Sequence, residues 1–298
     1  MRRWSVLVLL LLSAAGVLAQ DVRLPQGKDV LHFAVIGDSG TGGEEQLEIA
    51  RELVAFHPKF PFEFAIMLGD NLYGRERPHD YENKFEKPYK SLIDAGVKFY
   101  ASLGNHDEPN QRFYKLFNMN GERYYSFKPK DGVRFFALDS NNLDQKQIEW
   151  LEKELAASGS DWKICFFHHP PYSSGERHGS NLVLREQLEP LFVKYGVSAV
   201  FTGHEHFYER IKPQKGITYF IAGSSAKLRR GGIDKSPLTA KGYDQGYTFM
   251  LVAVEGDAMH FQTISHRGDT IDSGSLKRVE PQKPEGPTGT TGEGKTKS

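Results

Sequence analysis

Five short segments of the chain place metal-binding side chains next to a Gly or Pro at the end of an apolar run. They contain carboxylate, amide and imidazole groups, which are ligands for hard and borderline cations. Burying so many polar groups in one place would be costly unless a positive charge neutralised them. The segments therefore predict a metal site. In chain order, the five segments are Ile36-Gly37-Asp38, Leu68-Gly69-Asp70, Leu103-Gly104-Asn105-His106-Asp107, Phe167-His168-His169-Pro170 and Thr202-Gly203-His204-Glu205-His206.

Taken singly, each of these segments is a weak signal, because a lone Asp after a strand usually caps a helix or a turn. The pair His204 and His206 is more specific. On a strand, alternation of side chains would put both imidazoles on one face. By the same alternation we expect His169 to point away from His168 and not to be a ligand.

The first hundred residues alternate between apolar runs and helical patterns. Strands are expected at Leu31–Ile36, at Phe62–Leu68 and immediately before Asn105, where we expect Phe99, Ala101 and Leu103 to be buried. A helix is expected at Glu44–Phe56, and another through Tyr89, Leu92 and Ile93. This order predicts βαβ units with a largely parallel sheet. In such sheets ligands bind at the carboxyl ends of the strands, which is where the metal-binding side chains lie.

The second half of the chain adds a second sheet with its own helices. The fold class we predict is α/β, a two-sheet β-sandwich flanked by helices around a βαβαβ core, in a single domain at residues 20–280. Its expected elements are a hairpin at Tyr124–Phe127 and Val133–Leu138, helices at Gln145–Ala157 and through Leu184, Leu188 and Leu191, strands at Ile164–Phe167 and Ser198–Phe201, and antiparallel strands at Ile217–Ala222, Tyr247–Val254 and Ala258–Ile264.

Both ends of the chain differ in composition from this domain. Residues 1–19 have a basic start, an apolar run at Val6–Leu12 and small residues up to Ala19, as in a signal peptide. The run is too short for a stable membrane anchor, so we expect a secreted or periplasmic protein. The adjacent Arg2 and Arg3 leave twin-arginine export open beside the general route. Residues 281–298, rich in Pro, Gly and Thr, are predicted to form a disordered tail.

Composition limits the range of partners. Lys and Arg together number 38, as do Asp and Glu, so no basic field favours nucleic acid. We expect a monomer that acts on a small molecule. Cys165 is the single cysteine, which excludes an intramolecular disulfide. Its apolar neighbours favour a buried hydrophobic role over that of a reactive thiol.

The five segments, in order, resemble the sequence blocks of the purple acid phosphatases, which are calcineurin-like metallophosphoesterases. The resemblance runs from about Phe33 to Ala222, and the chain is similar to the small, single-domain type. Tyr73, three residues after Asp70, is the feature that separates the purple enzymes from other metallophosphoesterases. Two positions depart from the family pattern. Cys165 replaces the usual Val, and Ser39 stands where mammalian relatives have Trp.

The resemblance implies a dinuclear centre of Fe(III) and a second divalent metal, which would be Fe, Zn or Mn. Asp70 would bridge the two ions. The ferric ion would be held by Asp38, Asp70, Tyr73 and His206, and the divalent ion by Asp70, Asn105, His168 and His204. Phenolate and carboxylate suit a hard trivalent cation, whereas an amide oxygen and imidazoles suit a borderline divalent cation.

The implied activity is that of a secreted acid phosphatase, which hydrolyses phosphate monoesters by attack of metal-bound hydroxide. His106 is expected to contact the substrate phosphate or the leaving group, because it adjoins the ligand Asn105 and cannot easily reach the same metal. His178 is expected to be the general acid for the leaving group, although it is offset by about one residue from the His of relatives.

Two other functions stay open. The same ligands would serve a phosphodiesterase, including one for cyclic nucleotides, and a protein that binds metal or phosphate without catalysis is a different class. Arg229 and Arg230 would either contact a substrate anion or form a solvated basic loop, and the loop is favoured. The remaining histidines fit no block and are expected to be structural: His32, His57, His79, His260 and His266.

Overall fold

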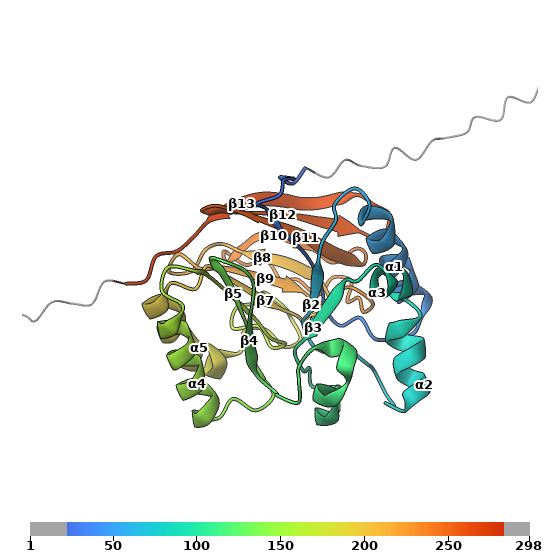
Figure 1. The fold of residues 1–298 in the computed structure, drawn as a ribbon, viewed down its shortest axis with the longest axis horizontal. Helices are drawn as coiled ribbons and strands as arrows, with labels where there is room; N and C mark the ends of the chain where they lie inside the picture. Colours follow the sequence, from blue (N-terminus) through green and yellow to red (C-terminus); the bar gives the residue numbers. More distant parts are fainter. Residues whose placement is uncertain (1–22, 283–298) are drawn as a thin grey trace, which may run out of the picture.

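A computed structural model describes residues 23–282, which form two mixed β-sheets with helices on their outer faces (Figure 1). The first sheet has the strand order β13-β12-β11-β1-β2-β3, and the second has the order β10-β8-β9-β7-β6-β5-β4. This architecture confirms the predicted fold class. The predicted signal peptide, residues 1–19, lies outside the described residues, as does most of the predicted tail.

The first sheet has a parallel half and an antiparallel half. The parallel half consists of β1 (Leu31–Ile36), β2 (Phe64–Met67) and β3 (Lys98–Ala101). β1 is apolar apart from His32 and is buried at every position, as expected for a strand covered on both faces. The antiparallel half consists of β11 (Thr248–Glu255), β12 (Ala258–Ser265) and β13 (Thr270–Lys277).

The second sheet has a parallel centre with antiparallel edges. The centre consists of β5 (Val133–Ala137), β6 (Trp162–Phe166), β7 (Ala199–Thr202) and β9 (Thr218–Ala222). The edges are β4 (Tyr125–Lys130) on one side, and β8 (Tyr208–Ile211) followed by β10 (Thr239–Tyr243) on the other.

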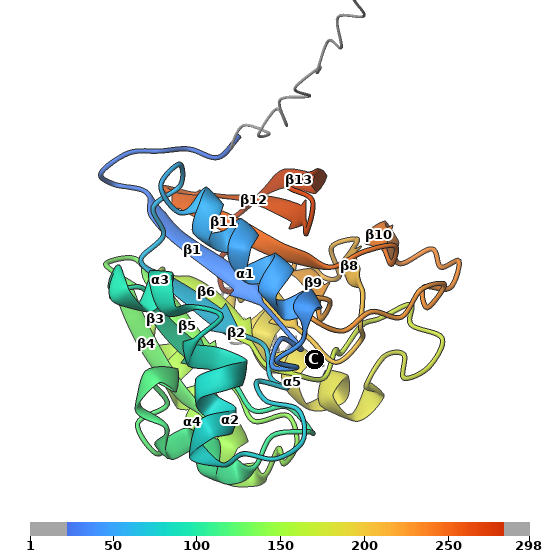
Figure 2. The same ribbon diagram turned by 90° about the vertical axis from the view of Figure 1, so that its right-hand side faces the viewer.

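Helices cover the outer face of each sheet. α1 (Glu44–Phe56) lies over the first sheet, as Figure 2 shows, and α4 (Gln145–Ala157) and α5 (Leu182–Tyr195) cover the second. Side-chain oxygens of Asp144 and Asn181 cap α4 and α5 at their first turns. Short helical segments join the parallel strands of the first sheet and follow β3: α2 (Pro78–Tyr81), a π-helix at Glu82–Glu86, α3 (Lys90–Asp94), and 3₁₀ turns at Pro109–Phe113 and Lys115–Phe117.

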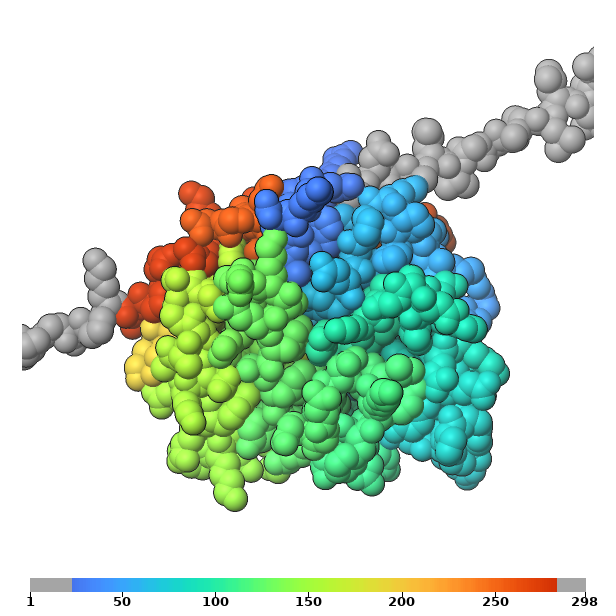
Figure 3. All heavy atoms as spheres, viewed as in Figure 1, coloured from blue at the N-terminus to red at the C-terminus, as the bar shows by residue number. Residues whose placement is uncertain are grey.

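Aromatic side chains fill the space between the two sheets. Phe33 of the first sheet lies with its ring centroid 5.5 Å from that of Phe64 and 5.1 Å from that of Phe135 in the second sheet. All three rings are buried. On the surface, the N-terminal part of the chain (blue to teal) and the part that follows it (green to yellow-green) adjoin directly (Figure 3). The sheets therefore hold one common core.

The helices α1 and α4 have the predicted bounds, whereas three strands were missed. β8, β10 and β13 carry polar or small residues at many positions, and β10 and β13 are sheet edges without an apolar run. The strand β9, predicted as antiparallel, has one neighbour of each kind. β9 is antiparallel to β8, but it runs parallel to β7, because the chain returns through β8 before it joins the sheet centre.

Within residues 23–282, none of the helices combines the length and the apolarity needed to cross a bilayer. Two residues of the predicted tail are described. The backbone N–H of Gln282 donates to the carbonyl of Lys194, 3.1 Å away near the end of α5. The described chain thus continues against the domain for two residues beyond the predicted boundary at residue 280.

Candidate metal centre

The parallel strands of both sheets end at one edge of the molecule, and the loops that follow them carry the predicted site residues. Asp38 follows β1, Asp70 follows β2 and Asn105 follows β3. His168 follows β6, and His204 with His206 follows β7. The two sheets meet here directly, since the backbone N–H of His204 donates to Oδ2 of Asp38 over 2.9 Å. One site is thus built from both sheets.

Backbone conformations at this edge are unusual. Asp38, Asp70 and His204 have φ angles of 54°, 50° and 68°, in the left-handed region that non-glycine residues seldom adopt. Such conformations cost free energy and cluster at functional sites. Two glycines permit the close approach of the loops, because a Cβ on Gly104 would overlap Oδ1 of Asp70 and one on Gly203 would overlap Oδ2 of Asp38.

The first group of donor atoms surrounds Oδ1 of Asp38. The hydroxyl of Tyr73 lies 3.2 Å from this oxygen and 3.4 Å from Nε2 of His206. The His206 nitrogen lies 3.4 Å from the same carboxylate oxygen. Asp38 is fully buried, whereas the His206 side chain is 20% exposed, so the group opens to solvent on the imidazole side.

The second group surrounds Nε2 of His168. The ring nitrogen Nδ1 lies 2.9 Å from the carbonyl of Leu68, which can only accept, so Nδ1 carries the proton. The unprotonated Nε2 then faces Oδ1 of Asn105 at 3.0 Å, Nδ1 of His204 at 3.1 Å and Oδ1 of Asp70 at 3.5 Å. Lone pairs of His168, Asn105 and Asp70 therefore converge, and a cation is the partner that satisfies all three.

Asp70 belongs to both groups. One donor atom each from Asp38, Asp70 and His206 lies within 4.8 Å of the others, and Asp70 also lies beside His168. Its Oδ1 accepts a hydrogen bond of 2.9 Å from the backbone N–H of His106, which holds the carboxylate in place. Asp70 thus occupies the position between the two groups.

The pKa values of the donor side chains indicate that the site binds positive charge. Burial, and then the charge of Asp70, raise the pKa of Asp38 well above its usual value. Burial lowers the pKa of His204 to about 2 and that of His206 to about 4. Burial and the Asp38 and Asp70 charges also raise the pKa of the Tyr73 phenol. The imidazoles are therefore neutral donors, and among residues 23–282 no lysine or arginine forms an ion pair with Asp38 or Asp70.

The types of the donor atoms and their arrangement in two groups fit a pair of metal ions. A carboxylate, a phenol and an imidazole form one group, and an amide oxygen with imidazoles forms the other, with Asp70 shared. Hard and borderline cations prefer these donors. His168 has the hydrogen bond from its second ring nitrogen to a backbone carbonyl that metal-binding histidines commonly make.

Two expectations about the histidines were wrong. His204 and His206 lie in the loop after β7 and not on a strand, so the turn of the loop, rather than strand alternation, directs their rings. His169 likewise lies beyond the end of β6. Its ring is 4.5 Å from that of His204, and His168, His169 and His204 form a group of donors within 4.8 Å. Alternation does not apply beyond a strand, so His169 does not point away.

The two predicted catalytic histidines flank the donor groups. The His106 ring is exposed and lies with its centroid 5.0 Å from that of Tyr73. The His178 ring is also exposed and lies 4.2 Å from the ring of His204. Partial loss of solvent around the ring, where it lies against His204, lowers the pKa of His178 from its usual value. Both rings are near the site and reach solvent from different loops.

Sequence reasoning missed two carboxylates that support the site. Glu205, fully buried, accepts hydrogen bonds from the backbone N–H groups of His178 and Gly179 at 3.2 and 2.9 Å. Asp107 accepts from the N–H groups of Gly104 and Leu72 at 2.8 and 3.0 Å. Both residues belong to the motif blocks: Glu205 lies between the predicted ligands His204 and His206, and Asp107 follows the predicted catalytic residue His106.

Three basic side chains follow β9. The guanidinium of Arg229 pairs with Glu205 at 3.0 Å, so this residue is part of the loop framework and not freely solvated as expected. Arg230 is exposed. Lys227, which sequence reasoning passed over, places its ammonium 4.5 Å from the centroid of the Tyr73 ring. Positive charge is therefore present beside the first donor group.

The residues assigned to the framework lie away from these donors. His32 contacts the carbonyls of Pro25 and Pro61 at 2.9 and 3.1 Å, and His57 contacts that of Phe62 at 3.2 Å. Cys165 is fully buried in β6, which confirms its packing role, and burial raises the pKa of its thiol.

A two-sheet α/β fold with these donors at its strand ends defines a metal-dependent hydrolase of the phosphoesterase class. The family profile described as calcineurin-like phosphoesterase matches residues 31–208. The chain belongs to the calcineurin-like phosphoesterase family. The matched region begins with β1 and ends at β8, so it includes every loop of the candidate metal centre.

Curated relatives carry the names that the motif blocks suggested. The chain is 27% identical over 270 residues to human tartrate-resistant acid phosphatase type 5, a match that covers 75% of this chain and 80% of the relative. It is 25% identical over 284 residues to purple acid phosphatase 7 of Arabidopsis thaliana, a match that covers 83% of this chain and 86% of the relative. These relatives confirm the resemblance to purple acid phosphatases.

Solved structures share the fold at lower identity. The purple acid phosphatase PPD1 of yellow lupin superposes with a TM-score of 0.69 at 16% identity, over 87% of this chain and 55% of the lupin chain. GAP50, the anchor in the inner membrane complex of Plasmodium, superposes with a TM-score of 0.77 at 20% identity. This superposition covers 86% of this chain and 91% of the GAP50 chain. At these identities the likeness shows the fold alone.

Proposed function

We propose that this protein is a secreted acid phosphatase that hydrolyses phosphate monoesters at a dinuclear centre of Fe(III) and a divalent metal. Its membership of the phosphoesterase family and its acid phosphatase relatives support the reaction class. Secretion is supported by residues 1–19 of the sequence alone. The small-molecule substrate and the monomeric state belong to the same proposal.

The observation that carries this proposal is the convergence of oxygen and nitrogen donor atoms on two adjacent points. Asp38, Tyr73 and His206 would hold the ferric ion, and Asn105, His168 and His204 the divalent ion. Asp70 would bridge them, which its place in both groups supports. When bound, the two ions would supply positive charge that binds phosphoryl oxygens and lowers the pKa of a water molecule.

The chain's own residues would then bind the ester and move a proton. His106, exposed beside Tyr73, would donate a hydrogen bond to the phosphate. His178 would donate a proton from its imidazole to the departing alkoxide oxygen, so that the alcohol leaves neutral. Glu205 would keep His178 in position through its hydrogen bond to the backbone of that residue. Lys227 would add positive charge near the phosphate.

Elemental analysis of natively purified protein, paired with hydrolysis assays, tests the proposal. We expect iron and a second metal in comparable amounts, and faster hydrolysis of p-nitrophenyl phosphate than of bis(p-nitrophenyl) phosphate at acidic pH. Faster hydrolysis of the diester would favour the phosphodiesterase. No turnover of either ester by protein that carries both metals would contradict an enzymatic role and favour a protein that only binds metal or phosphate.

A further inference from the structure

A polar pocket of about 890 Å³ opens beside the candidate metal centre. Asn105 and His169 belong to its lining, so it is continuous with the donor groups. Small-molecule sites in proteins commonly measure about 300–1,000 Å³. The pocket therefore has room for the alcohol part of an ester whose phosphate lies at the metal centre.

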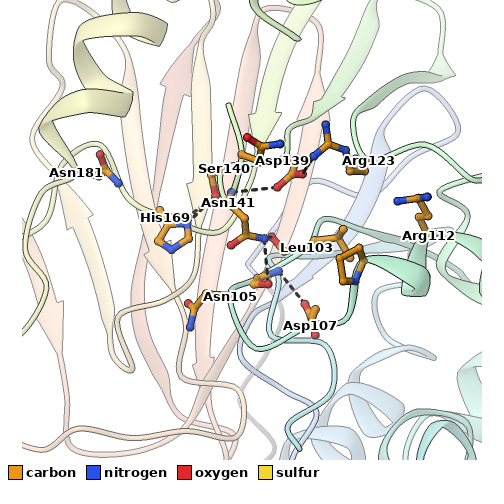
Figure 4. A pocket seen from close by; sticks show the side chains of 13 residues that line it. Leu103, Asn105, Asp107, Arg112, Arg123, Asp139, Ser140, Asn141, His169 and Asn181 are labelled. Atoms are coloured by element: carbon orange, nitrogen blue, oxygen red, sulfur yellow. Dashed lines mark hydrogen bonds and ion pairs between the residues drawn. The ribbon is translucent and has the colours of Figure 1, made fainter. Parts of the chain in front are cut away.

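The two ends of this pocket differ in chemistry, as Figure 4 shows. His169 and Asn105, which adjoin the donor groups, lie on the left of the view, whereas Arg112 and Arg123 lie on the right. Amide and hydroxyl side chains lie between them, among them Asn141. The pocket thus runs from the donor groups to a pair of guanidinium groups, with hydrogen-bonding side chains along the way.

The carboxylates in the lining are already satisfied within the protein. Asp139 pairs with Arg123 at 3.2 Å and accepts the backbone N–H of Asn141 at 3.0 Å. Asp107 accepts from the side-chain amides of Gln111 at 2.7 Å and Asn71 at 3.1 Å, in addition to its backbone donors. Neither carboxylate is left to bind a cationic ligand.

Arg112 differs from Arg123, because it has no acidic partner in the described part of the chain. Among residues 23–282 no carboxylate lies within ion-pair distance of its guanidinium. The group stacks on the ring of Phe113, with 4.6 Å between its central carbon and the ring centroid. The carbonyl of Arg112 accepts a 2.8 Å hydrogen bond from Gly121, which ties its 3₁₀ turn to the next loop. A positioned guanidinium without a counterion is a binding group for an anion.

We propose that this pocket binds the alcohol part of a phosphate ester that carries a second anionic group, phosphate or carboxylate, and that Arg112 contacts this group. The inference rests on the proposed function, because it places the reacting phosphate at the metal centre. It makes the substrate a doubly anionic metabolite, such as a sugar bisphosphate or a phosphorylated hydroxy acid. The hydroxyl groups of such a molecule would bond to the amides of the lining.

Matched substrate pairs test the proposal. For the full chain with its metals, we expect kcat/KM for fructose 1,6-bisphosphate to exceed that for fructose 6-phosphate roughly ten- to hundredfold, the range for a charge-assisted hydrogen bond. The pair 3-phosphoglycerate and glycerol 3-phosphate tests a carboxylate as the second anionic group, whereas the fructose pair tests a phosphate. Arg112→Gln should reduce these ratios toward one, and Arg112→Lys should retain part of them. Arg51→Gln, an exposed charge change on α1, is the control and should keep the wild-type ratios.

Binding to metal-stripped protein gives a readout that needs no turnover. Calorimetry should show that Arg112→Gln weakens the Kd for fructose 1,6-bisphosphate by tenfold or more, while Arg51→Gln does not. Equal kcat/KM values within each pair, or an unchanged Kd in Arg112→Gln, would overturn the inference and leave the proposed function intact. A preference for phosphopeptides that is independent of Arg112 would also overturn it. If no ester is hydrolysed, the proposed function fails, and the Kd comparison alone decides this inference.

Discussion

Tyr73 is the residue on which the iron assignment depends. Its hydroxyl lies beside Asp38 and His206, where a phenolate bound to ferric iron would give visible charge-transfer absorption. We expect Tyr73→Phe to lose this colour, as measured by absorption spectroscopy of iron-loaded protein. Tyr81→Phe, which alters a phenol bonded to Glu76, is the matched control and should stay coloured. Colour that persists without the Tyr73 hydroxyl would contradict the assignment.

His206 predicts how the stability of metal-free protein depends on pH. Its folded-state pKa is lowered to about 4, below the value of about 6.5 expected when unfolded. Between these two values the unfolded chain binds more protons, so the free energy of unfolding falls as pH decreases from 6.5 to 4. The contribution is at most about 1.4 kcal/mol per pH unit.

Urea unfolding of chelator-treated protein at several pH values measures how steeply the free energy of unfolding changes with pH. His206→Gln removes the titrating imidazole and should give a shallower slope over the same interval. Asp38 acts in the opposite direction, because burial raises its pKa and the folded state then holds the extra proton. The comparison of the variant with wild type therefore isolates the imidazole. An identical slope in both proteins would show that His206 is not buried as a neutral group.

At the scale of elements, the loop that carries His178 depends on Glu205. This buried carboxylate accepts from two backbone N–H groups of the loop and pairs with Arg229. We expect Glu205→Gln to leave the partly buried Arg229 guanidinium poorly compensated and to lower the free energy of unfolding by about 1–3 kcal/mol. Hydrogen exchange at residues 175–179 should become faster, because the loop loses its anchor.

Glu176 provides the control for that substitution, since its side chain is exposed in the same loop. Glu176→Gln should change neither the unfolding free energy nor the exchange rates. A second variant, Gly175→Ala, would place a Cβ in contact with the Glu205 carboxylate and should speed exchange in the loop as well. Slow exchange in both the Glu205 and Gly175 variants would show that the loop is held by other contacts.

At the scale of the whole molecule, one aromatic core joins the two sheets. Phe33 contacts Phe64 in its own sheet and Phe135 and Phe201 in the other. We expect Phe33→Ala to lower the free energy of unfolding by about 3–5 kcal/mol, measured by urea titration, in a single transition that involves both sheets. Phe113→Ala, at a ring that is 64% exposed, should change it by less than about 0.5 kcal/mol. Two separate transitions would contradict a common core.

Metal binding should stabilise the same assembly, because the donor groups come from loops of both sheets. A ligand that binds only the folded state adds about 4 kcal/mol when its free concentration is a thousand times its Kd. We therefore expect a chelator to lower the midpoint temperature of unfolding in calorimetry, and added metal to restore it. An Asp70→Asn variant, which lacks the shared carboxylate, should show a smaller difference between the two conditions.

The order of the apolar runs and the local turn chemistry were sufficient to predict most elements. α1 and α4 have the predicted bounds, because each carries a helical pattern bounded by polar or glycine residues. The polar edge strands β10 and β13 could not be found in this way. Their residues join the sheets through backbone pairing with a neighbour, and no local apolar pattern records that pairing.

The same division holds for the candidate site. The sequence by itself determined the donor types and their places after apolar strands, because each block is a local pattern of a few residues. Only the tertiary structure decided which atoms face one another. In the structure His169 lies beside His204, and Glu205 is buried beneath the His178 loop. Arg112 lies across the pocket with no counterion among residues 23–282. These contacts join residues that are far apart in the chain. The backbone angles of the loops beyond the strand ends determine them, so strand alternation could not predict them.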